Sequence, residues 1–268
     1  MLDLSENKSE AGGTQSIGRA TALLRVLAAA GPAGMGLGEV AARAQMERPT
    51  VHRILRRLIN EAMVIQAPSS RAYHLGPLLY ELGLAAAPSI PAQELCTAAL
   101  KELSMITGDS SFLMVRSGTD SVCLQRQEGH FPIKVLVLAV GQRRPLGCGA
   151  GSIALMSLLP DEQVDNLLRV NRARLDAHGE PDTQTLRAII RKARDDGFAT
   201  KDAPDLPVRS LSMPVRDAFG NGLCALSVTS LTMRIEQRQS TLVSSLRQLT
   251  QELSRKIPGT FKGMASDA

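Results

Sequence analysis

Arg48-Pro-Thr-Val-His-Arg-Ile-Leu-Arg-Arg-Leu-Ile-Asn60 has the most informative pattern in this chain of 268 residues. Wound as a helix, it gathers its apolar residues on one face at the spacing i, i+3, i+4, i+7 and i+8: Val51, Ile54, Leu55, Leu58 and Ile59. The opposite face is polar and cationic: Thr50, Arg53, Arg56, Arg57 and Asn60. A helix that packs on one side and offers arginines on the other suits a DNA groove, although such a face can also be simply solvated.

The sequence before this helix predicts a helix-turn-helix. Ser16–Ala30 reads as a first helix that stops at Gly31-Pro32-Ala33-Gly34. Leu37–Ala44 reads as a short second helix, and only three residues separate it from the arginine-rich helix. Two helices joined by so short a turn form the motif in which the second one reads DNA. Pro49 fits at the first helical position, where its missing N–H is not needed.

Two short strands follow and predict a wing. Val64–Gln66 and Ala72–Leu75 flank Pro68-Ser-Ser-Arg71, which has turn chemistry. A wing would place Arg71 near its tip, within reach of a phosphate or a minor groove. Residues 15–76 carry eight Lys/Arg against three Asp/Glu, and the other residues together carry no net charge, so the net charge of +5 lies in this segment. That is the electrostatic pattern of a DNA-binding head.

Length and composition predict a second, larger domain. A chain of 268 residues suits about two domains, and 44% hydrophobic residues suffice for a second core. We expect a disordered tail over residues 1–14, a linker helix within residues 77–90, a second domain over 91–258 and a flexible end over 259–268. The apolar linker helix, Leu78–Ala87, is expected to pack against a partner subunit or against the DNA-binding head. No apolar run is long enough to span a membrane and no signal peptide is evident, so a cytoplasmic location is expected.

The second domain alternates between element types. The expected strands are Ser110–Arg116, Ser121–Gln127, Ile133–Ala139, Val208–Arg216 and Leu223–Ser230. The expected helices are Ala92–Thr107, Gly149–Leu159, Asp161–Val170, Asp182–Asp196 and Arg234–Lys256. Hairpins with segregated helices predict an α+β domain with an antiparallel sheet.

A glycine-dense turn, Pro145-Leu-Gly-Cys-Gly-Ala-Gly-Ser-Ile-Ala154, runs into one of these helices. Backbone N–H groups at a helix start attract anions, but such turns often hold glycine for steric reasons alone. On the strand Ala225–Thr229, Ser227 and Thr229 point to one face, as paired hydroxyls suited to a small carboxylate or as ordinary strand hydroxyls bonded locally. The four cysteines form no Cys-x-x-Cys pair, so neither a metal site nor a disulfide framework is predicted.

Three short segments carry a family resemblance: Gln15-Ser-Ile-Gly-Arg-Ala20, Pro49-Thr-Val-His-Arg53 and Tyr73-His-Leu-Gly-Pro77. In their order and spacing the chain resembles the IclR family of bacterial transcription regulators over nearly its whole length. The resemblance implies a winged helix-turn-helix followed by a GAF-like or profilin-like effector-binding domain, in a dimer or tetramer. Pro49 departs from the small hydroxyl residue usual before Thr-Val-His-Arg, which changes the contacts expected at the helix start.

Together the helix pattern and the resemblance give a set of expected DNA contacts. Base contacts are expected from Thr50, His52, Arg53 and Arg56, and phosphate contacts from Arg19, Arg57 and Arg71. Arg48 and Tyr73 complete the expected DNA-binding set.

The resemblance also implies the walls of an effector pocket. They are expected to comprise Leu146, Cys148, Gly151, Ser152, Asp202, Ser210, Ser212, Ser227 and Thr229. Gly147, Ser152 and Ile153 replace residues usual in the family, which implies a different ligand set.

The expected function is a ligand-controlled transcriptional regulator, a repressor by type, whose partners are double-stranded DNA, a small effector such as a carboxylate or aromatic acid, and further copies of itself. No catalytic constellation, cofactor motif or metal motif appears, so an enzyme is not expected. The alternative is a DNA-binding regulator whose second domain serves only oligomerisation.

Overall fold

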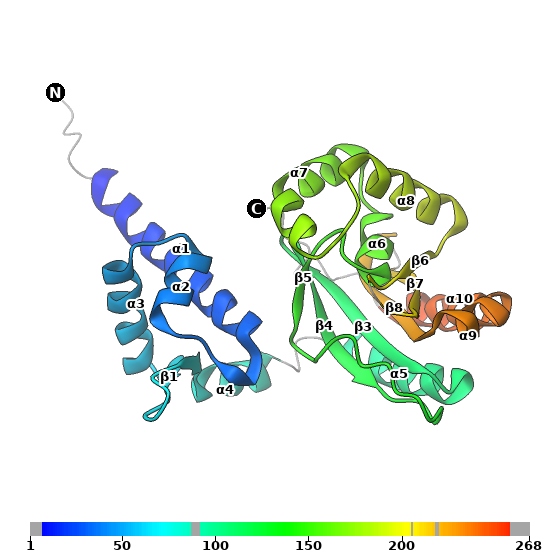
Figure 1. Cartoon of the computed structure of the whole chain (residues 1–268), viewed down its shortest axis with the longest axis horizontal. Coiled ribbons are helices and arrows are strands. Elements are labelled where there is room, and N and C mark those ends of the chain that lie inside the picture. Colours follow the sequence, from blue (N-terminus) through cyan, green and yellow to red (C-terminus); the bar gives the residue numbers. More distant parts are fainter. Residues whose placement is uncertain (1–6, 87–91, 205, 218–219, 258–268) are drawn as a thin grey trace. The chain divides into compact units, whose positions relative to one another are not determined.

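The computed structural model describes residues 7–86, 92–204, 206–217 and 220–257. The chain divides into two compact units, Met1–Ile90 and Pro91–Ala268. Within the described residues, the first unit has one hydrophobic core and the second has two. Figure 1 shows the helices and strands of both units.

The first unit is helical with one small hairpin. Its elements are α1 (Asn7–Ala30), the 3₁₀ turn η1 (Gly31–Ala33), α2 (Leu37–Ala44), α3 (Arg48–Asn60), β1 (Val64–Gln66), β2 (Tyr73–Leu75) and α4 (Pro77–Ala86). The bounds of α2 and α3 are those predicted, and β1 pairs with β2 in an antiparallel wing. This is the predicted winged helix-turn-helix.

The core of this unit explains why α3 has a fixed orientation. Val51, Leu55 and Leu58 are buried on the apolar face of α3. They belong to the same core as Leu23 of α1 and Val40 of α2. Burying a side chain of this size contributes about 1.5–3 kcal/mol, so rotation of α3 about its axis would be costly. The polar face of α3 is therefore held toward solvent.

The start of α1 differs from expectation. The helix was predicted to begin at Ser16 after a disordered tail of residues 1–14, but it begins at Asn7. Once a helix is nucleated, each further residue adds one hydrogen bond at little extra cost, so a polar segment can extend an existing helix. The polar composition of this segment and its glycines, Gly12 and Gly13, predicted a flexible tail and did not reveal this extension. Residues 1–6 lie outside the described part of the chain.

The second unit is an α+β domain built on one antiparallel sheet. Its strands are β3 (Ser110–Ser117), β4 (Asp120–Gln127), β5 (Arg143–Pro145), β6 (Ala199–Asp202), β7 (Val208–Arg216) and β8 (Gly222–Leu231), and their order in the sheet is β5-β4-β3-β8-β7-β6. Its helices are α5 (Ala92–Thr107), α6 (Ala150–Met156), α7 (Asp161–Ala177), α8 (Thr183–Asp196), α9 (Thr232–Gln237) and α10 (Gln239–Lys256).

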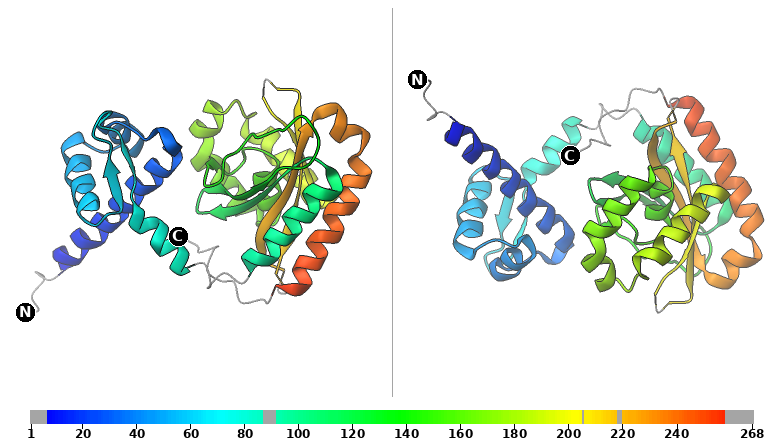
Figure 2. Two further views of the ribbon diagram at one scale, coloured as in Figure 1. Left: turned by 90° about the horizontal axis from the view of Figure 1, so that it is seen from below. Right: turned by 90° about the horizontal axis from the view of Figure 1, so that it is seen from above.

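Helices cover both faces of this sheet. On β3, Leu113 and Val115 pack with α5 and α10, while Phe112 and Met114 belong to the core formed with α6, α7 and α8. Figure 2 shows α5 and α10 on one side of the sheet and α6 to α8 on the other. Because side chains alternate between the faces of a strand, β3 and β8 serve two separate cores.

Some predicted elements of this unit were wrong. Ile133–Ala139 was predicted as a strand but is irregular, and the structure adds two strands that were not predicted, β5 and β6. The carbonyl groups of Val137 and Leu138 accept hydrogen bonds from arginine side chains instead of from a neighbouring strand. The predicted helix Arg234–Lys256 is two helices, broken at Arg238, and α7 runs seven residues beyond the predicted end at Val170.

Candidate functional sites

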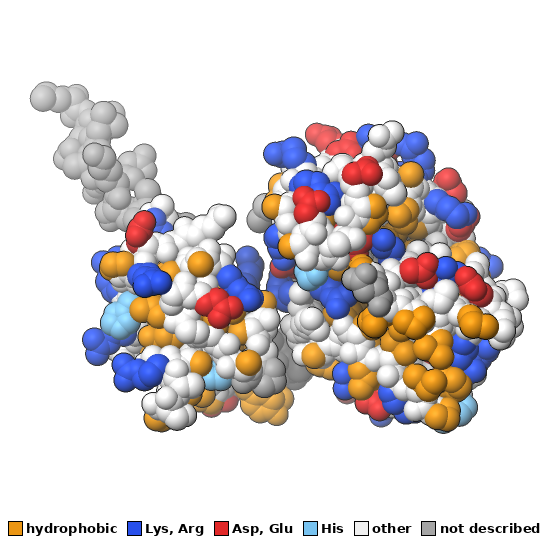
Figure 3. Space-filling model, viewed as in Figure 1, with side chains coloured by type: hydrophobic (Ala, Val, Ile, Leu, Met, Phe, Trp, Pro, Cys, Tyr) orange, Lys and Arg blue, Asp and Glu red, His pale blue; other side chains and the backbone are white. Residues whose placement is uncertain are grey.

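The outer face of α3 is the first candidate site. His52, Arg53, Arg56 and Arg57 are exposed, and Thr50 is half-buried. Arg57 forms an i,i+4 ion pair with Glu61 at 2.6 Å. Figure 3 shows basic side chains and a histidine gathered over this part of the unit. The surface offers multiple hydrogen-bond donors of positive charge on one rigid helix, which is what a major groove accepts.

The other predicted DNA contacts surround α3 at varying depth. Arg48 is exposed at the first turn of α3 and lies against α2, where its Nη2 would be 3.0 Å from a Cβ added at Gly38. Arg71 is exposed in the turn of the wing, with φ 59°, a left-handed conformation that few side chains favour. Arg19 is half-buried on α1.

Tyr73 does not belong to this surface. Its side chain is 4% exposed and packs in the core of the unit, while its backbone bonds to Met35. The predicted DNA contact from Tyr73 is therefore wrong for its ring. A tyrosine at the start of a short strand has no local feature that distinguishes an outward from an inward side chain, because β2 spans only three residues.

The second candidate site is a pocket on the α6 face of the sheet. Its floor contains a ladder of hydroxyl groups, since β7 and β8 place Ser210 opposite Thr229 and Ser212 opposite Ser227. The side-chain oxygens are 2.8 Å apart in the first pair and 2.7 Å apart in the second. These cross-strand bonds pair each hydroxyl with its neighbour, which was one of the two alternatives that the sequence left open for Ser227 and Thr229. Ser210, Ser227 and Thr229 nevertheless line the cavity.

The glycine-dense turn brings α6 onto this floor. A Cβ at Gly151 would lie 2.7 Å from Cγ of Met114 and 3.2 Å from Oγ of Ser227. Only glycine therefore allows α6 to approach β3 and β8 this closely. Ser152 is buried and accepts a hydrogen bond from the N–H of Gly147 at 2.6 Å.

Two predicted pocket residues are not among the lining residues. Leu146 and Ser212 are both fully buried, and neither lines the two cavities of this site. Leu146 packs in the core with α6 and α7. Ser212 donates to the carbonyl of Leu226 and bonds to the hydroxyl of Ser227, so it belongs to the ladder but does not reach the cavity.

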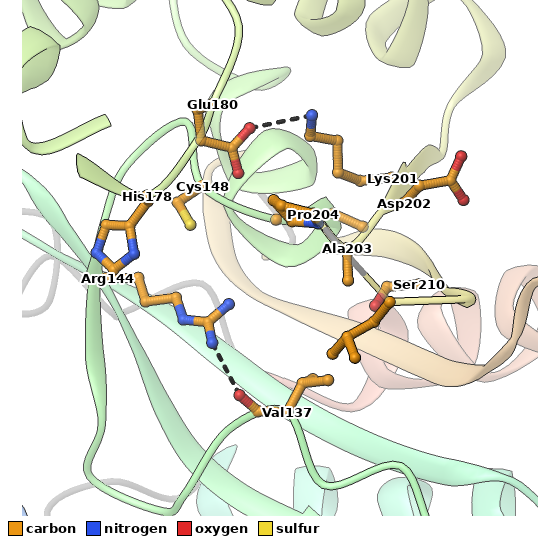
Figure 4. A pocket seen from close by; sticks show the side chains of 13 residues that line it. Val137, Arg144, Cys148, His178, Glu180, Lys201, Asp202, Ala203, Pro204 and Ser210 are labelled. Carbon is orange, nitrogen blue, oxygen red and sulfur yellow. Dashed lines mark hydrogen bonds and ion pairs between the residues drawn. The ribbon is translucent and has the colours of Figure 1, made fainter. Parts of the chain in front are cut away.

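Asp202 lies at the rim. Its carboxylate makes a two-point contact with Arg209, at 2.6 Å from Oδ1 to Nε and 2.8 Å from Oδ2 to Nη2. These hydrogen bonds lower the pKa of Asp202 below its ordinary value. The carboxylate points away from the other labelled side chains in Figure 4. Its charge is thus already matched by Arg209.

The pocket also has a charged wall that the sequence did not reveal. Arg144, Glu180 and Lys201 line a cavity of about 290 Å³, which continues into a recess of about 50 Å³ above Ser227 and Thr229. Lys201 Nζ lies 3.0 Å from Oε2 of Glu180. Arg144 donates from Nη2 to the carbonyl of Val137 at 2.8 Å, which fastens the irregular segment before β5 over the pocket (Figure 4). Arg144 directly precedes the quoted glycine-dense turn, whereas Lys201 lies on the unpredicted strand β6.

Cys148 lies in this wall as a protonated thiol. Burial and the negative charge of Glu180 raise its pKa to about 12, against the opposing effect of Arg144. Burial lowers the pKa of His178, and the positive charges of Arg144 and Arg174 lower it further. At neutral pH the Cys148 thiol is therefore uncharged, and, besides His178, the acidic and basic side chains that line the cavity are Arg144, Lys201, Glu180 and, at the rim, Asp202.

The described residues contain neither a metal-binding cluster nor a helix able to span a membrane. No group of three or more His, Cys, Asp or Glu side chains there could hold a metal ion. None of the helices over the same residues is both long and apolar enough to cross a membrane.

The chain is similar to known proteins over both units. The model for the IclR helix-turn-helix domain matches residues 16–68, and the model for the bacterial transcriptional regulator IclR C-terminal domain matches residues 85–255. The HTH-type transcriptional regulator Rv1719 of Mycobacterium tuberculosis is 31% identical over 74% of this chain and 75% of its own length. The HTH-type transcriptional regulator KdgR of Escherichia coli is 24% identical over 83% of this chain and 86% of its own.

A solved structure has the same fold. The IclR transcriptional regulator of Alicyclobacillus acidocaldarius superposes with a TM-score of 0.73 at 23% identity, over 90% of this chain and 98% of the other.

Proposed function

The chain belongs to the IclR family of bacterial transcriptional regulators, and from this premise we propose that a small carboxylate bound by its second unit controls how its first unit binds DNA. The chain is a DNA-binding transcriptional regulator, as its relatives are, and not an enzyme. Our proposal concerns the identity of the ligand, the residues that bind it and the oligomeric state.

For the DNA contacts, we assign base recognition to Thr50, Arg53 and Arg56, with His52 beside them. The support is their shared exposure on the outer face of α3, whose inner face is fixed in the core. Arg19, Arg48, Arg57 and Arg71 would hold phosphates around that helix. One such helix reads few bases, so two copies on a pseudo-palindromic site would supply the specificity.

For the ligand, the supporting observation is the uneven charge of the pocket wall. Glu180 pairs with Lys201, and Asp202 shares Arg209 with Glu236, whereas no carboxylate of the described residues forms an ion pair with Arg144. A ligand with one carboxylate balances its charge. Cys148, Gly151, Ser152, Ser210, Ser227 and Thr229 would form the rest of the binding site.

Ligand binding would act on DNA binding by favouring one arrangement of the protein over another. Arg144 joins the ligand site to the segment before β5 through the carbonyl of Val137. A carboxylate bound to this guanidinium would therefore alter how that segment is held.

The test has two parts that use the full chain. Operator fragments are selected from random duplex DNA, and their affinity is then measured with and without a panel of small carboxylates. We expect at least one carboxylate both to raise the midpoint of thermal unfolding and to change operator affinity, and Arg144→Gln to lose both effects. Arg191→Gln, at an exposed position on α8, is the control. DNA binding with no response to any acid would favour the role of the second unit in oligomerisation only.

A further inference from the structure

The pocket of the second unit brings together a buried donor and a buried acceptor that lack hydrogen-bond partners. Arg144 Nε and Glu180 Oε2 are two of five such buried side-chain atoms among the described residues; the others belong to Ser110, Asp120 and Arg187. Arg144 and Glu180 line the same cavity. Since buried polar atoms are nearly always paired in folded proteins, a donor and an acceptor left together in one pocket indicate what a ligand supplies.

The acceptor is a carboxylate removed from solvent. The side chain of Glu180 is 2% exposed, and Lys201 Nζ lies 3.0 Å from its Oε2. This contact balances the charge but lacks the direction of a hydrogen bond, so Oε2 keeps its capacity to accept one. A group that donates to Glu180 here must fit beside the ammonium of Lys201.

The donor is the guanidinium of Arg144. Its Nη2 is occupied by the carbonyl of Val137, and its Nε has no acceptor. Within the described residues, no carboxylate forms an ion pair with it, so its charge and its free N–H both call for an anion. In Figure 4, Arg144 and Glu180 lie on either side of Cys148, along one wall of the pocket.

Building on the proposed function, we infer that the ligand is a small hydroxycarboxylate. Its carboxylate accepts a hydrogen bond from Arg144 Nε, and its hydroxyl donates to Glu180 Oε2. An ammonium group in place of the hydroxyl would lie next to the like charge of Lys201, which disfavours an amino acid. An unsubstituted aliphatic acid would leave Oε2 without a partner, so it would lack the contribution of this hydrogen bond to the binding free energy.

The pocket is large enough to hold a small organic acid. Its main volume of about 290 Å³ narrows to a recess of about 50 Å³ lined by Phe112 and Met114 as well as by hydroxyls. In the recess, the hydroxyls of Ser210 and Thr229 already bond to each other, so they are not free to select a ligand. We therefore assign the selection between ligands to the charged wall, and the recess holds one small end of the ligand.

The inference is tested with matched pairs of acids on the full-length protein. Lactate is compared with propionate, 3-hydroxybutyrate with butyrate, and gluconate with hexanoate, by titration calorimetry and by operator binding. For at least one pair we expect the hydroxylated acid to bind about tenfold or more tightly, the typical effect of a hydrogen bond to a charged group. Alanine and 3-aminobutyrate serve as the ammonium-bearing counterparts of lactate and 3-hydroxybutyrate, and they are expected to bind more weakly than the hydroxy acids.

Two variants assign the effect to the wall. Glu180→Leu with Lys201→Met removes the acceptor together with its counter-ion, so no unpaired charge is left buried. This double variant is expected to lose the preference for the hydroxy acid, measured as the ratio of the two affinities within each pair. Glu162→Gln, on the exposed face of α7, is the control and should keep the preference.

The outcomes separate the two proposals. If plain and hydroxylated acids bind equally in every pair, the hydroxycarboxylate assignment is wrong while carboxylate control of DNA binding stands. If the preference survives in the double variant, Glu180 is not its source and the assignment is likewise wrong. If none of the acids binds, the proposed ligand control itself fails.

Discussion

At the scale of single residues, the two sites depend on opposite kinds of environment. The role proposed for Arg53 requires exposure, since an arginine can form a two-point contact with a guanine only if its guanidinium is free. Gly151 acts through the absence of a side chain, because α6 reaches the sheet only where no Cβ intervenes. A pattern of residue types reveals the first kind more readily than the second.

Replacing Arg53 by Ala tests the reading face. We expect operator affinity to fall by about 1–3 kcal/mol and the base preference at one position to relax, because one base contact is lost. Affinity for operator and for single-base variants is measured by fluorescence anisotropy at fixed salt. Arg191→Ala on α8 is the control, and an unchanged affinity in Arg53→Ala would remove α3 from the role of recognition helix.

Replacing Gly151 by Ala tests the close approach of α6. The added Cβ would meet Met114 at 2.7 Å, so overpacking should cost the second unit about 1–3 kcal/mol of unfolding free energy. The measurement is denaturant unfolding, followed by a signal of the second unit. Gly18→Ala is the control, since nothing lies within 4 Å of that position and alanine favours an exposed helix. Equal stability of wild type and Gly151→Ala would show that α6 can move away without cost.

At the scale of elements, the helix termini illustrate how local chemistry positions the walls of the pocket. α8 begins after Asp182, whose Oδ1 accepts a hydrogen bond from the N–H of Thr185 at 2.9 Å, and ends at Gly197 in a left-handed conformation. These are the usual start and stop signals of a helix. Glu180 lies two residues before Asp182, so this cap also fixes the loop that carries the pocket acceptor.

The capping role of Asp182 predicts a pH dependence. The hydrogen bonds from Thr185 hold the pKa of Asp182 below its ordinary value. A carboxyl group with a lowered folded-state pKa stabilises the fold above its unfolded-state pKa, and this contribution is lost as the pH falls through the folded value. Asp182→Ala should therefore lower the unfolding midpoint of the second unit at neutral pH, and the difference from wild type should shrink in acid.

The measurement for this prediction is thermal unfolding of both proteins across the acid range. Asp195→Ala at the other end of α8 is the control, because Asp195 is exposed and accepts no cap hydrogen bond. A difference between Asp182→Ala and wild type that stays constant with pH would contradict a charged cap.

At the scale of the whole molecule, the exposed apolar side chains of α4 have consequences for assembly. In the single chain Tyr80 is 71% exposed and Leu84 is 56% exposed, on a helix of only ten residues. So much exposed apolar surface on one helix is typical of an interface. The sequence suggested that this helix packs against a partner subunit or against the DNA-binding head, and the exposure within the chain favours the partner subunit.

Replacing Leu84 by Glu tests that proposal. A charge at the interface should shift the protein toward a monomer and weaken operator binding, because two joined heads bind a pseudo-palindrome better than one. Mass is measured by light scattering on size-exclusion chromatography, and operator affinity is measured in parallel. Met105→Glu is the control, being 70% exposed on α5 of the other unit. An unchanged mass and affinity in Leu84→Glu would place the interface elsewhere.

The sequence by itself determined the parts of this protein that depend on local periodicity. The bounds of α2 and α3 follow from a spacing of 3.6, and the common face of Ser227 and Thr229 on β8 follows from a spacing of 2. The cationic face of α3 needs no tertiary information. Several pocket residues were also identified, through a family resemblance that covers both units.

Only the tertiary structure decided which side chains meet in the pocket and which are buried near it. Arg144, Glu180 and Lys201 come from β5, a loop and β6, so no periodicity relates them, and three-residue β5 is set by pairing with β4. Tyr73, Leu146 and Ser212 were assigned to sites but lie inside the cores. The physical reason is that local patterns fix which face of an element is apolar, whereas contacts between distant segments depend on how the sheet and helices pack.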